Sequence, residues 1–356
     1  MLCTGARILL ESLKREGVDL FFGYPGGAVI DIYDELSNHP DLRHILVRHE
    51  QGAVHAADGY ARACGKVGVC LATSGPGATN TVTGIATAYS DSIPMVIFTG
   101  QVSTPLIGND AFQEVDIIGI TRPCTKHNFL VKDVKDLAET VRKAFYLARS
   151  GRPGPVLVDI PKNIQQASCE FVWPEDVVMR SYCPTFRANL NQLRRAMDVL
   201  VTSRKPLIVA GGGVIMANAA EELCTLAHLM HAPVCSTLMG LGAFPGDDPL
   251  WIGMLGMHGT FAANRAVTQA DVILAVGARF NDRVTGKLSQ FAPNARIVHI
   301  DIDPTTLRKN VRVEVPVVSD ALSALQGLRS ILESGHAQKD WAGDHADWMG
   351  QVLEWQ

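Results

Sequence analysis

Short, continuous apolar runs alternate with helical segments along the whole chain of 356 residues. In the first half they lie at residues 19–22, 44–47, 67–73, 94–99 and 155–160. Runs of this kind are typical of strands that are buried on both faces of a parallel sheet. Because helical segments separate them, the pattern predicts an α/β fold with doubly wound, mostly parallel sheets.

A second alternating block begins near residue 191, after a stretch without a clear period. The chain is long enough for two or three domains. We therefore expect a first domain over residues 1–165, a linker over 166–188, a second domain over 189–335, and a connector to a further domain over 336–356. The strand-like runs of the second block lie at 206–210, 233–237, 270–276, 296–300 and 315–318.

The composition narrows the class of protein. Hydrophobic residues make up 47% of the chain, charged residues 19%, and the net charge is −4, as in a well-packed soluble protein. The sequence contains no basic stripe of the kind that indicates binding to nucleic acid. No apolar run approaches the ~18 residues of a membrane span, and the N-terminus does not resemble a signal peptide. The eight scattered cysteines, with no C-x-x-C pair, fit reduced thiols in a cytoplasmic protein.

Glu50 stands where a strand-like run passes into a helical segment rich in alanine and glycine, residues 53–61. One interpretation is a common first-turn acid that the helix dipole favours. The other is an acid/base group at the carboxyl end of a parallel strand, where α/β proteins place their chemistry. The residue alone does not decide between the two.

Glycine-rich turns follow strand-like runs in both blocks. Residues 74–80 (SGPGATN) let a ligand approach the backbone at a helix start, but they form neither a dinucleotide fingerprint nor a Walker loop. Gly211, Gly212 and Gly213 have the same placement in the second block.

Further strand ends of the second block carry charged residues. Arginines at 279 and 283 suit a pyrophosphate, and acids at 301 and 303 suit a ribose. Together with the glycines they favour an extended adenine dinucleotide, although each residue singly fits a cap or a surface ion pair.

The long connection between residues 100 and 154 holds two polar segments, 110–114 (DAFQE) and 125–128 (TKHN), that fit a pocket lining. The sequence also contains His127 and His258; histidines in such places are more often hydrogen-bonded structural residues than catalytic ones. No Ser-His-Asp order, H-E-x-x-H or C-x-x-C arrangement occurs. We name no metal ligands in this sequence.

Ten short motifs are spread over nearly the whole chain. They are 23–27 (GYPGG), 48–53 (RHEQGA), 74–80, 100–102 (GQV), 110–114, 125–128, 151–155 (GRPGP), 254–259 (MLGMHG), 277–286 (GARFNDRVTG) and 301–304 (DIDP). Taken together, these motifs closely resemble the large catalytic subunits of acetolactate synthase, a thiamine-diphosphate-dependent family.

The resemblance implies three domains, which bind the aminopyrimidine of thiamine diphosphate, FAD, and the diphosphate with Mg²⁺. Only the first two correspond to this sequence, because the third-domain signature, which begins with Gly-Asp-Gly, does not occur in it. The Mg²⁺ ligands are therefore expected in a third domain.

By the same resemblance, Glu50 would share a proton with N1′ of the aminopyrimidine and so favour the imino form that accepts the C2 proton. Gly27, Phe112, Gln113 and Lys126 would flank the substrate side. The residues expected to contact FAD are Arg152, Gly211, Gly212, Gly213, Leu255, Gly256, Met257, His258, Gly277, Ala278, Arg279, Asp282, Arg283, Asp301, Ile302 and Asp320.

The resemblance also implies pyruvate and 2-oxobutyrate as substrates in branched-chain amino acid biosynthesis, a homodimer or tetramer, and a small regulatory subunit. Two alternatives stay open. One is a related FAD- and thiamine-dependent enzyme such as pyruvate oxidase, and the other is a non-catalytic flavin-binding fragment. We expect the isolated chain to be inactive without the third domain.

Overall fold

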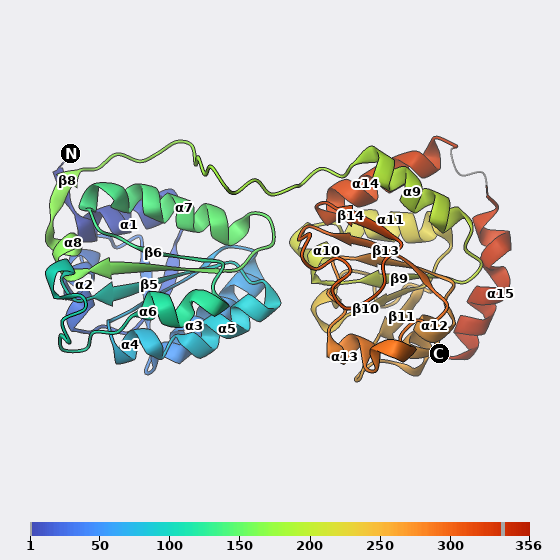
Figure 1. Ribbon diagram of the computed structural model, residues 1–356, viewed down its shortest axis with the longest axis horizontal. Helices are drawn as coiled ribbons and strands as arrows, with labels where there is room; N and C mark the ends of the chain where they lie inside the picture. Colours follow the sequence, from blue (N-terminus) through green and yellow to red (C-terminus); the bar gives the residue numbers. More distant parts are fainter. Residues whose placement is uncertain (1, 336–338) are drawn as a thin grey trace. The chain divides into compact units, whose positions relative to one another are not determined.

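The computed structural model describes residues 2–335 and 339–356. The chain divides into two compact units between Cys183 and Pro184 (Figure 1). Each unit has one six-stranded parallel sheet, which confirms the expected α/β class with doubly wound sheets. Met1 of the expected first domain and residues 336–338 of the expected connector lie outside the described residues.

The sheet of the first unit has the strand order β3-β2-β4-β5-β7-β6, with parallel neighbours throughout. The chain passes from β2 outward to β3 and then returns to β4 on the other side. The carboxyl ends of β2 and β4 therefore mark a topological switch point, where open α/β sheets bind ligands. The strands are β2 (Leu20–Gly23), β3 (Arg43–Leu46), β4 (Gly68–Ala72), β5 (Met95–Gln101), β6 (His127–Leu130) and β7 (Pro155–Pro161).

Helices cover both faces of this sheet (Figure 1). One apolar layer contains α1 (Gly5–Arg15) and α7 (Leu137–Arg149), and the other face carries α3 (Glu50–Cys64) and α5 (Val82–Asp91). Thr4 caps α1, since its hydroxyl accepts the Arg7 amide at 3.3 Å. The shorter helices are α2 (Ile30–Leu36), α4 (Pro76–Thr79), α6 (Ile117–Thr121) and α8 (Lys162–Gln166).

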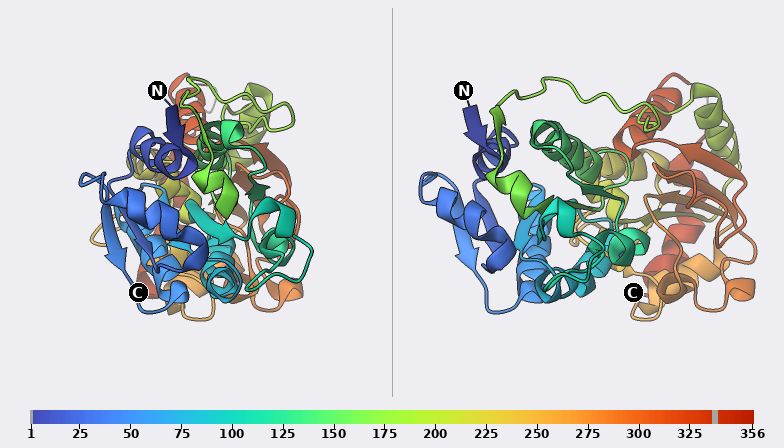
Figure 2. Two further views of the ribbon diagram at one scale, coloured as in Figure 1. Left: turned by 90° about the vertical axis from the view of Figure 1, so that its left-hand side faces the viewer. Right: turned by 60° about the vertical axis from the view of Figure 1, so that its left-hand side comes forward.

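Three strands of the first unit were not expected from the sequence. β6 is an edge strand that pairs only with β7. β1 (Leu2–Thr4) and β8 (Ser168–Glu170) form a separate antiparallel ribbon beside α1 (Figures 1 and 2). Beyond β8, residues 171–189 contain neither helix nor strand.

The sheet of the second unit has the order β11-β10-β9-β12-β13-β14, again with parallel neighbours. In chain order this is 3-2-1-4-5-6, the arrangement of dinucleotide-binding folds, and its switch point lies between β9 and β12. The strands are β9 (Pro206–Ala210), β10 (Val234–Ser236), β11 (Trp251–Met254), β12 (Val272–Val276), β13 (Arg296–Asp301) and β14 (Val315–Val318).

Two apolar clusters lie on the two faces of this sheet. α9 (Leu190–Val201), α11 (Ala220–Met230) and α14 (Ala321–Glu333) pack in one cluster, and α12 (Phe261–Gln269) packs in the other. Two short helices, α10 (Gly212–Met216) and α13 (Asp282–Thr285), begin just after β9 and after the β12 turn.

α15 (Trp341–Glu354) falls in the segment expected to be a connector, and it packs on the second unit. Trp341 and Met349 join one apolar cluster while Trp348 and Val352 join the other. The Trp348 indole N–H donates to the carbonyl of Pro206, the first residue of β9, at 2.8 Å. α15 therefore lies at the amino-terminal edge of the sheet.

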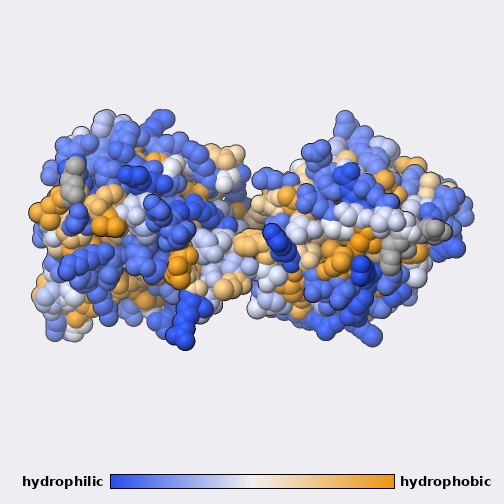
Figure 3. Space-filling view, turned by 90° about the horizontal axis from the view of Figure 1, so that it is seen from above, coloured by the Kyte–Doolittle hydropathy of each residue, from blue (hydrophilic) through white to orange (hydrophobic). Residues whose placement is uncertain are grey.

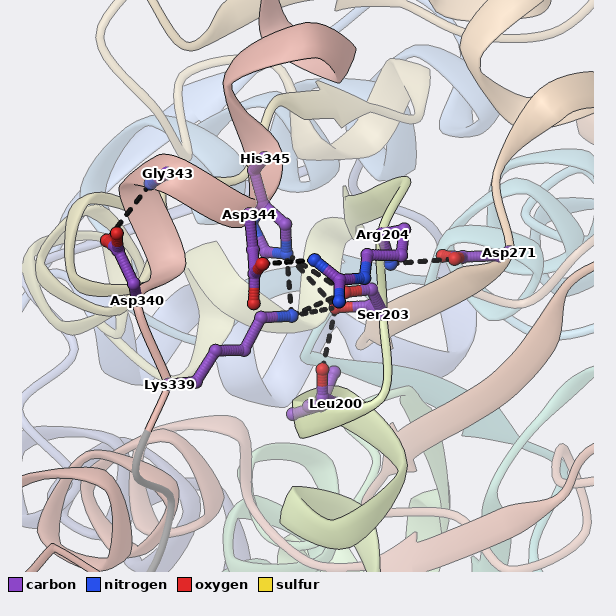
Figure 4. A network of polar contacts seen from close by, with 9 residues as sticks. All are labelled: Leu200, Ser203, Arg204, Asp271, Lys339, Asp340, Gly343, Asp344 and His345. Carbon is purple, nitrogen blue, oxygen red and sulfur yellow. Dashed lines mark hydrogen bonds and ion pairs between the residues drawn. The ribbon is translucent and has the colours of Figure 1, made fainter.

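A buried polar network fixes the start of α15 (Figure 4). His345 is fully buried, and its Nδ1 lies 2.9 Å from the Met230 carbonyl oxygen. The Lys339 ammonium lies 3.0 Å from His345 Nε2 and also donates to the Ser203 carbonyl. Nε2 also lies 3.2 Å from the Ser203 carbonyl oxygen. Burial, reinforced by the Lys339 charge, lowers the pKa of His345.

Hydrophilic residues cover most of the face that Figure 3 shows on each unit. All eight cysteines are free thiols. Among the described helices, none is both long and apolar enough to cross a membrane.

Candidate cofactor sites

Glu50 is the first residue of α3 and lies at the carboxyl edge of the first sheet, just beyond β3. His49 caps the helix, with its Nδ1 accepting the Gln51 amide at 3.1 Å. The Glu50 side chain turns inward, and the residue is only 8% exposed. Its Oε2 accepts a hydrogen bond from Asn80 Nδ2 at 2.9 Å. A first-turn acid that served only the helix dipole would have no need of burial.

The Glu50 carboxylate affects the pKa values of two buried groups nearby, Cys70 and Tyr33. Burial, with a contribution from the Glu50 carboxylate, raises the pKa of the Cys70 thiol to about 12. The pKa of Tyr33 is also raised, mainly by burial and further by Cys70 and Glu50. The Glu50 side chain is therefore close enough to these two buried groups to act on their pKa values.

The turns after β2 and β4 meet beside Glu50. The Thr73 hydroxyl accepts the Ala28 amide at 3.2 Å, and a Cβ at Gly26 would lie 2.5 Å from Thr73 Cγ2. A Cβ at Gly77 would lie 3.2 Å from Glu50 Oε1, whereas Gly27 faces open space. Glycine is needed at positions 26 and 77 because the two turns and the carboxylate pack so closely. The predicted glycines and Glu50 thus come together at the switch point.

The loop that holds Phe112 and Gln113 reaches the same place through its backbone. Gly75 has φ +58°, and a Cβ there would lie 2.5 Å from the Gln113 carbonyl oxygen. Gln113 itself has φ +55°. The Glu114 carboxylate accepts the Gly108 and Ala111 amides and closes the loop. The Phe112 side chain is 86% exposed, so it projects away from the first unit.

A buried acid that the sequence reasoning missed supports this loop. Asp159 on β7 accepts hydrogen bonds from Thr99 Oγ1 at 2.7 Å and Gln101 Nε2 at 3.0 Å. Gln101 also donates to the Val115 carbonyl at 3.0 Å, next to the loop. Burial raises the pKa of Asp159 to about 7. The signal in the sequence is an acid inside the apolar run PVLVDI.

The structure does not bring Lys126 to Glu50 within the first unit. Lys126 immediately precedes β6, and its amide donates to the carbonyl of Pro155, the first residue of β7. Its ammonium donates to the Leu147 and Ser150 carbonyls and to the Tyr182 hydroxyl. Since the strands are parallel, this is the amino-terminal edge, opposite Glu50. The ammonium there caps the end of α7.

Arg152 lies at the same amino-terminal edge of the first sheet, in the turn before β7. Its Nε donates to the Ser92 hydroxyl at 2.8 Å. Like Lys126, it is separated from Glu50 by the length of the strands. Arg152 precedes the predicted run at 155–160, so its edge could be read from the sequence, whereas Lys126 precedes β6, a strand that the sequence did not predict.

The second unit brings its predicted glycines into backbone contact at the switch point between β9 and β12. A Cβ at Gly211 would lie 2.0 Å from the Gly277 carbonyl oxygen, and one at Gly213 would lie 2.7 Å from Gly277 Cα. Gly277 has φ +60°. The Gly213 amide donates to the Gly277 carbonyl at 3.2 Å. Only glycine allows α10 to start this close to the end of β12. Gly212, between them, faces Met239.

The segment after β11 joins the segment after β12. The Met257 amide donates to the Arg283 carbonyl at 2.8 Å. Gly256, which has φ +97°, packs against the backbone of the same arginine. Arg283 and Asp282 are exposed, with 3.7 Å between Arg283 Nε and Asp282 Oδ2. Of the other predicted residues there, Leu255 and Ala278 are buried, Arg279 is half-buried, and Met257 and His258 are exposed.

The predicted acids end the last two strands at this edge. Asp301 is buried at the end of β13, where its Oδ1 accepts the Asp303 amide at 2.9 Å, and Ile302 beside it is half-buried. Asp320 caps α14 by accepting the Leu322 and Ser323 amides. All of the predicted second-unit residues therefore lie at the carboxyl edge of one sheet, at a strand end, in the loops that follow the strands, or in the short helices α10 and α13.

His299 is a second residue that the sequence reasoning missed. It is 1% exposed, its ring is 5.1 Å from that of Phe280, and its Nε2–H donates to the Ala278 carbonyl at 2.7 Å. Burial lowers the pKa of His299 to about 4, so the ring is neutral and holds the loop after β12 in place. Phe280 in that loop has φ +53°.

Comparison with known proteins gives two family matches, one in each unit. Residues 3–120 match the thiamine pyrophosphate enzyme, N-terminal TPP binding domain, and residues 193–328 match the thiamine pyrophosphate enzyme, central domain. The second match covers the sheet whose strand order and glycines are described above.

Similar proteins carry acetolactate synthase names. The chain is 52% identical to the acetolactate synthase isozyme 3 large subunit of Escherichia coli over 99% of the chain and 62% of that protein. It is 53% identical to a probable acetolactate synthase large subunit of Methanocaldococcus jannaschii over 98% of the chain and 59% of that protein. For acetolactate synthase large subunit IlvB1 of Mycobacterium tuberculosis the identity is 52% over 94% of the chain and 54% of that protein.

The chain therefore spans about three fifths of the length of these relatives. Because the two family models lie one in each unit and the relatives align along nearly the whole chain, the chain belongs to the thiamine pyrophosphate enzyme family, with homologues that are acetolactate synthase large subunits.

Proposed function

We propose that this chain is the N-terminal and central part of an acetolactate synthase large subunit. The complete protein would decarboxylate pyruvate and transfer the two-carbon unit to a second 2-oxo acid, pyruvate or 2-oxobutyrate, in branched-chain amino acid biosynthesis. The names of relatives that are about half identical support this assignment. The single observation in the structure that carries it is the buried, hydrogen-bonded carboxylate of Glu50 at the switch point of the first sheet.

The residues around Glu50 fit an aminopyrimidine. The carboxylate is held by Asn80 through one oxygen, Oε2, while Oε1 faces Gly77, where a side chain would intrude. Thiamine diphosphate, when bound, would supply the carbon nucleophile and the electron sink for decarboxylation. Glu50 would hold a proton at N1′ of the ring. The glycines of the adjoining turns would admit the ring, and Asn80 would fix the carboxylate orientation.

The second unit is proposed to bind FAD. The strand order, the glycine contact at its switch point and the acids at the ends of β13 and β14 support an extended dinucleotide there. Gly211, Gly212 and Gly213 would let the pyrophosphate approach the backbone. Arg279 and Arg283 would neutralise its charge, and Asp301 and Asp320 would lie nearest the polar groups of the dinucleotide.

Further parts of the proposal rest on the family resemblance. Mg²⁺ and the diphosphate would be held by residues of a third domain. Lys126 and the exposed Phe112 side chain would reach a substrate only in an assembled dimer or tetramer, while the Gln113 backbone already lies beside Gly75. A small regulatory subunit and a cytoplasmic location are proposed with it. The relatives named large subunits support a multi-subunit enzyme.

The test uses the full-length gene product, with acetolactate formation from pyruvate as the readout. Replacement of Glu50 by glutamine removes the proton-sharing carboxylate but keeps its size. We expect kcat to fall by about 10²–10⁴-fold, the range for losing a positioned acid/base group. Replacement of Glu139 by glutamine, on the exposed side of α7, is the matched control and should leave the rate unchanged.

Two results would contradict the proposal. If the Glu50→Gln enzyme keeps wild-type activity, Glu50 does not share the proton. If neither variant nor wild type forms acetolactate but another thiamine-dependent product appears, the assignment within the family is wrong. FAD is tested separately, by titration of the 356-residue chain followed by flavin fluorescence; a chain that takes up no flavin would exclude the second-unit site.

A further inference from the structure

Three side chains of metal-ligating type meet in the second unit, outside the expected cofactor sites. Cys224 and His228 are four residues apart on α11, so they project from one face of the helix. Asp248 comes from the segment that leads into β11. This segment precedes the strand, and the cluster therefore lies away from the carboxyl edge that holds the predicted flavin residues.

The potential ligand atoms of these residues, one from each, all lie within 4.8 Å of one another. His228 Nε2 is 2.8 Å from Asp248 Oδ2. The other carboxylate oxygen of Asp248 accepts the Leu250 amide at 2.9 Å, and its carbonyl accepts the Trp251 amide at 2.9 Å. The backbone thus orients the carboxylate, with Oδ2 directed at the histidine.

The His–Asp contact alone would be an ordinary surface ion pair. The third group distinguishes this site, because the Cys224 thiol is half-buried beside the pair and packs against the apolar cluster beneath α11. The Asp248 side chain is 13% exposed and the His228 side chain 50% exposed. One side of the cluster therefore packs against the protein interior, and the other side is open to solvent.

We propose that Cys224, His228 and Asp248 bind Zn²⁺ as three protein ligands, with water in the fourth position. A thiolate, an imidazole and a carboxylate are all zinc ligands, at about 2.0–2.3 Å from the ion. Tetrahedral geometry at those lengths separates the ligand atoms by roughly 3.3–3.7 Å. Since the ligand atoms lie within 4.8 Å of one another, the thiol needs to approach by at most about 1 Å, while the histidine and carboxylate separate slightly.

Binding breaks the His228–Asp248 hydrogen bond and forms three bonds to the ion. The thiol proton of Cys224 goes to solvent, and the imidazole binds through Nε2 with its proton on Nδ1. No electrons are transferred. The bound ion would tie α11 to the segment before β11, so its effect would be to stabilise the second unit.

The experiment uses the full chain, stripped of metal with chelator, and Co²⁺ as the spectroscopic probe. We expect one equivalent of Co²⁺ to produce tetrahedral d–d bands and a thiolate-to-cobalt charge-transfer band, and Zn²⁺ to displace it. Replacement of Cys224 by serine should abolish the charge-transfer band. His228→Gln and Asp248→Asn should each weaken Co²⁺ binding by at least tenfold.

Cys64→Ser is the matched control, because Cys64 is an exposed thiol at the end of α3. It should leave the cobalt spectrum unchanged. His228→Gln alters an exposed side chain and keeps the fold, so a loss of binding in this variant cannot be attributed to unfolding. Wild-type chain that gives no charge-transfer band, or a band that persists in Cys224→Ser, would overturn the proposal.

Discussion

Asp159 makes the stability of the first unit depend on pH in a direction that can be calculated. The carboxyl group is 1% exposed, and its two described hydrogen-bond partners, Thr99 and Gln101, are neutral. Burial raises its pKa from an ordinary value of 3.8 to about 7. Between these two values the unfolded chain loses the proton while the folded chain keeps it. Stability from this group is therefore complete below pH 3.8 and declines as pH rises through 7.

Each unit of pKa difference corresponds to about 1.4 kcal/mol. Between pH 5 and pH 8 the linkage relation gives a loss of about 2.5 kcal/mol, because the decline levels off above the folded-state value. Asn cannot ionise, so Asp159→Asn removes this loss. Relative to wild type, the variant should gain about 2.5 kcal/mol between pH 5 and pH 8, whatever the cost of the substitution itself.

The assay is urea unfolding at pH 5, 6, 7 and 8, followed by amide exchange in peptides from β5 and β7, which reports the first unit alone. Asp34→Asn, on the exposed surface of α2, is the matched control with the same change of charge. Its difference from wild type should vary little with pH. If the difference between Asp159→Asn and wild type is also constant across this range, the argument from burial is refuted.

Three further predictions concern the second unit. Gly211→Ala places a Cβ 2.0 Å from the Gly277 carbonyl oxygen and should lower the unfolding free energy by about 1–3 kcal/mol, measured by urea denaturation. The control Gly246→Ala adds a Cβ in open space and should leave the unfolding free energy unchanged. Equal effects of the two substitutions would contradict the backbone contact. Trp348→Phe leaves the Pro206 carbonyl without its indole donor and should lower the unfolding free energy by about 1–3 kcal/mol, by the same measurement. The loss should be larger than that of Trp355→Phe, at the end of the helix. The reverse order would be inconsistent with a buried hydrogen bond. Asn189→Ala removes the cap that accepts the Asn191 and Gln192 amides and should cost about 1 kcal/mol, seen as a lower thermal midpoint; no change would show that the cap is dispensable.

The sequence predicted the buried central strands well, because continuous apolar runs leave few alternatives to a parallel sheet. The runs at 94–99 and 270–276 correspond to β5 and β12. β6 was missed because it contains His127 and Asn128 and is paired on one side only. β1 and β8 were missed because each has three residues, too few to show a period.

The candidate sites were predicted unevenly for a physical reason. Residues at the carboxyl ends of parallel strands gather at one edge of their own sheet, so the sequence could place Glu50 at that edge in the first unit and group Gly211 with Gly277 in the second. Lys126 precedes a strand and lies at the other edge. Asp159 acts through side chains on the adjacent strand β5, and His299 acts through the loop that follows the adjacent strand β12. Both contacts depend on strand order, which the sequence does not state.

The contact among Gly211, Gly213 and Gly277 has a consequence for how this fold can diverge. The atom that a new side chain would strike is main chain in each case, so no smaller residue nearby could relieve the clash. A lost glycine at these positions therefore has no second-site suppressor among its neighbours. Random mutagenesis under selection for a folded second unit should return glycine at all three, while Gly246, with no neighbour to strike, drifts freely.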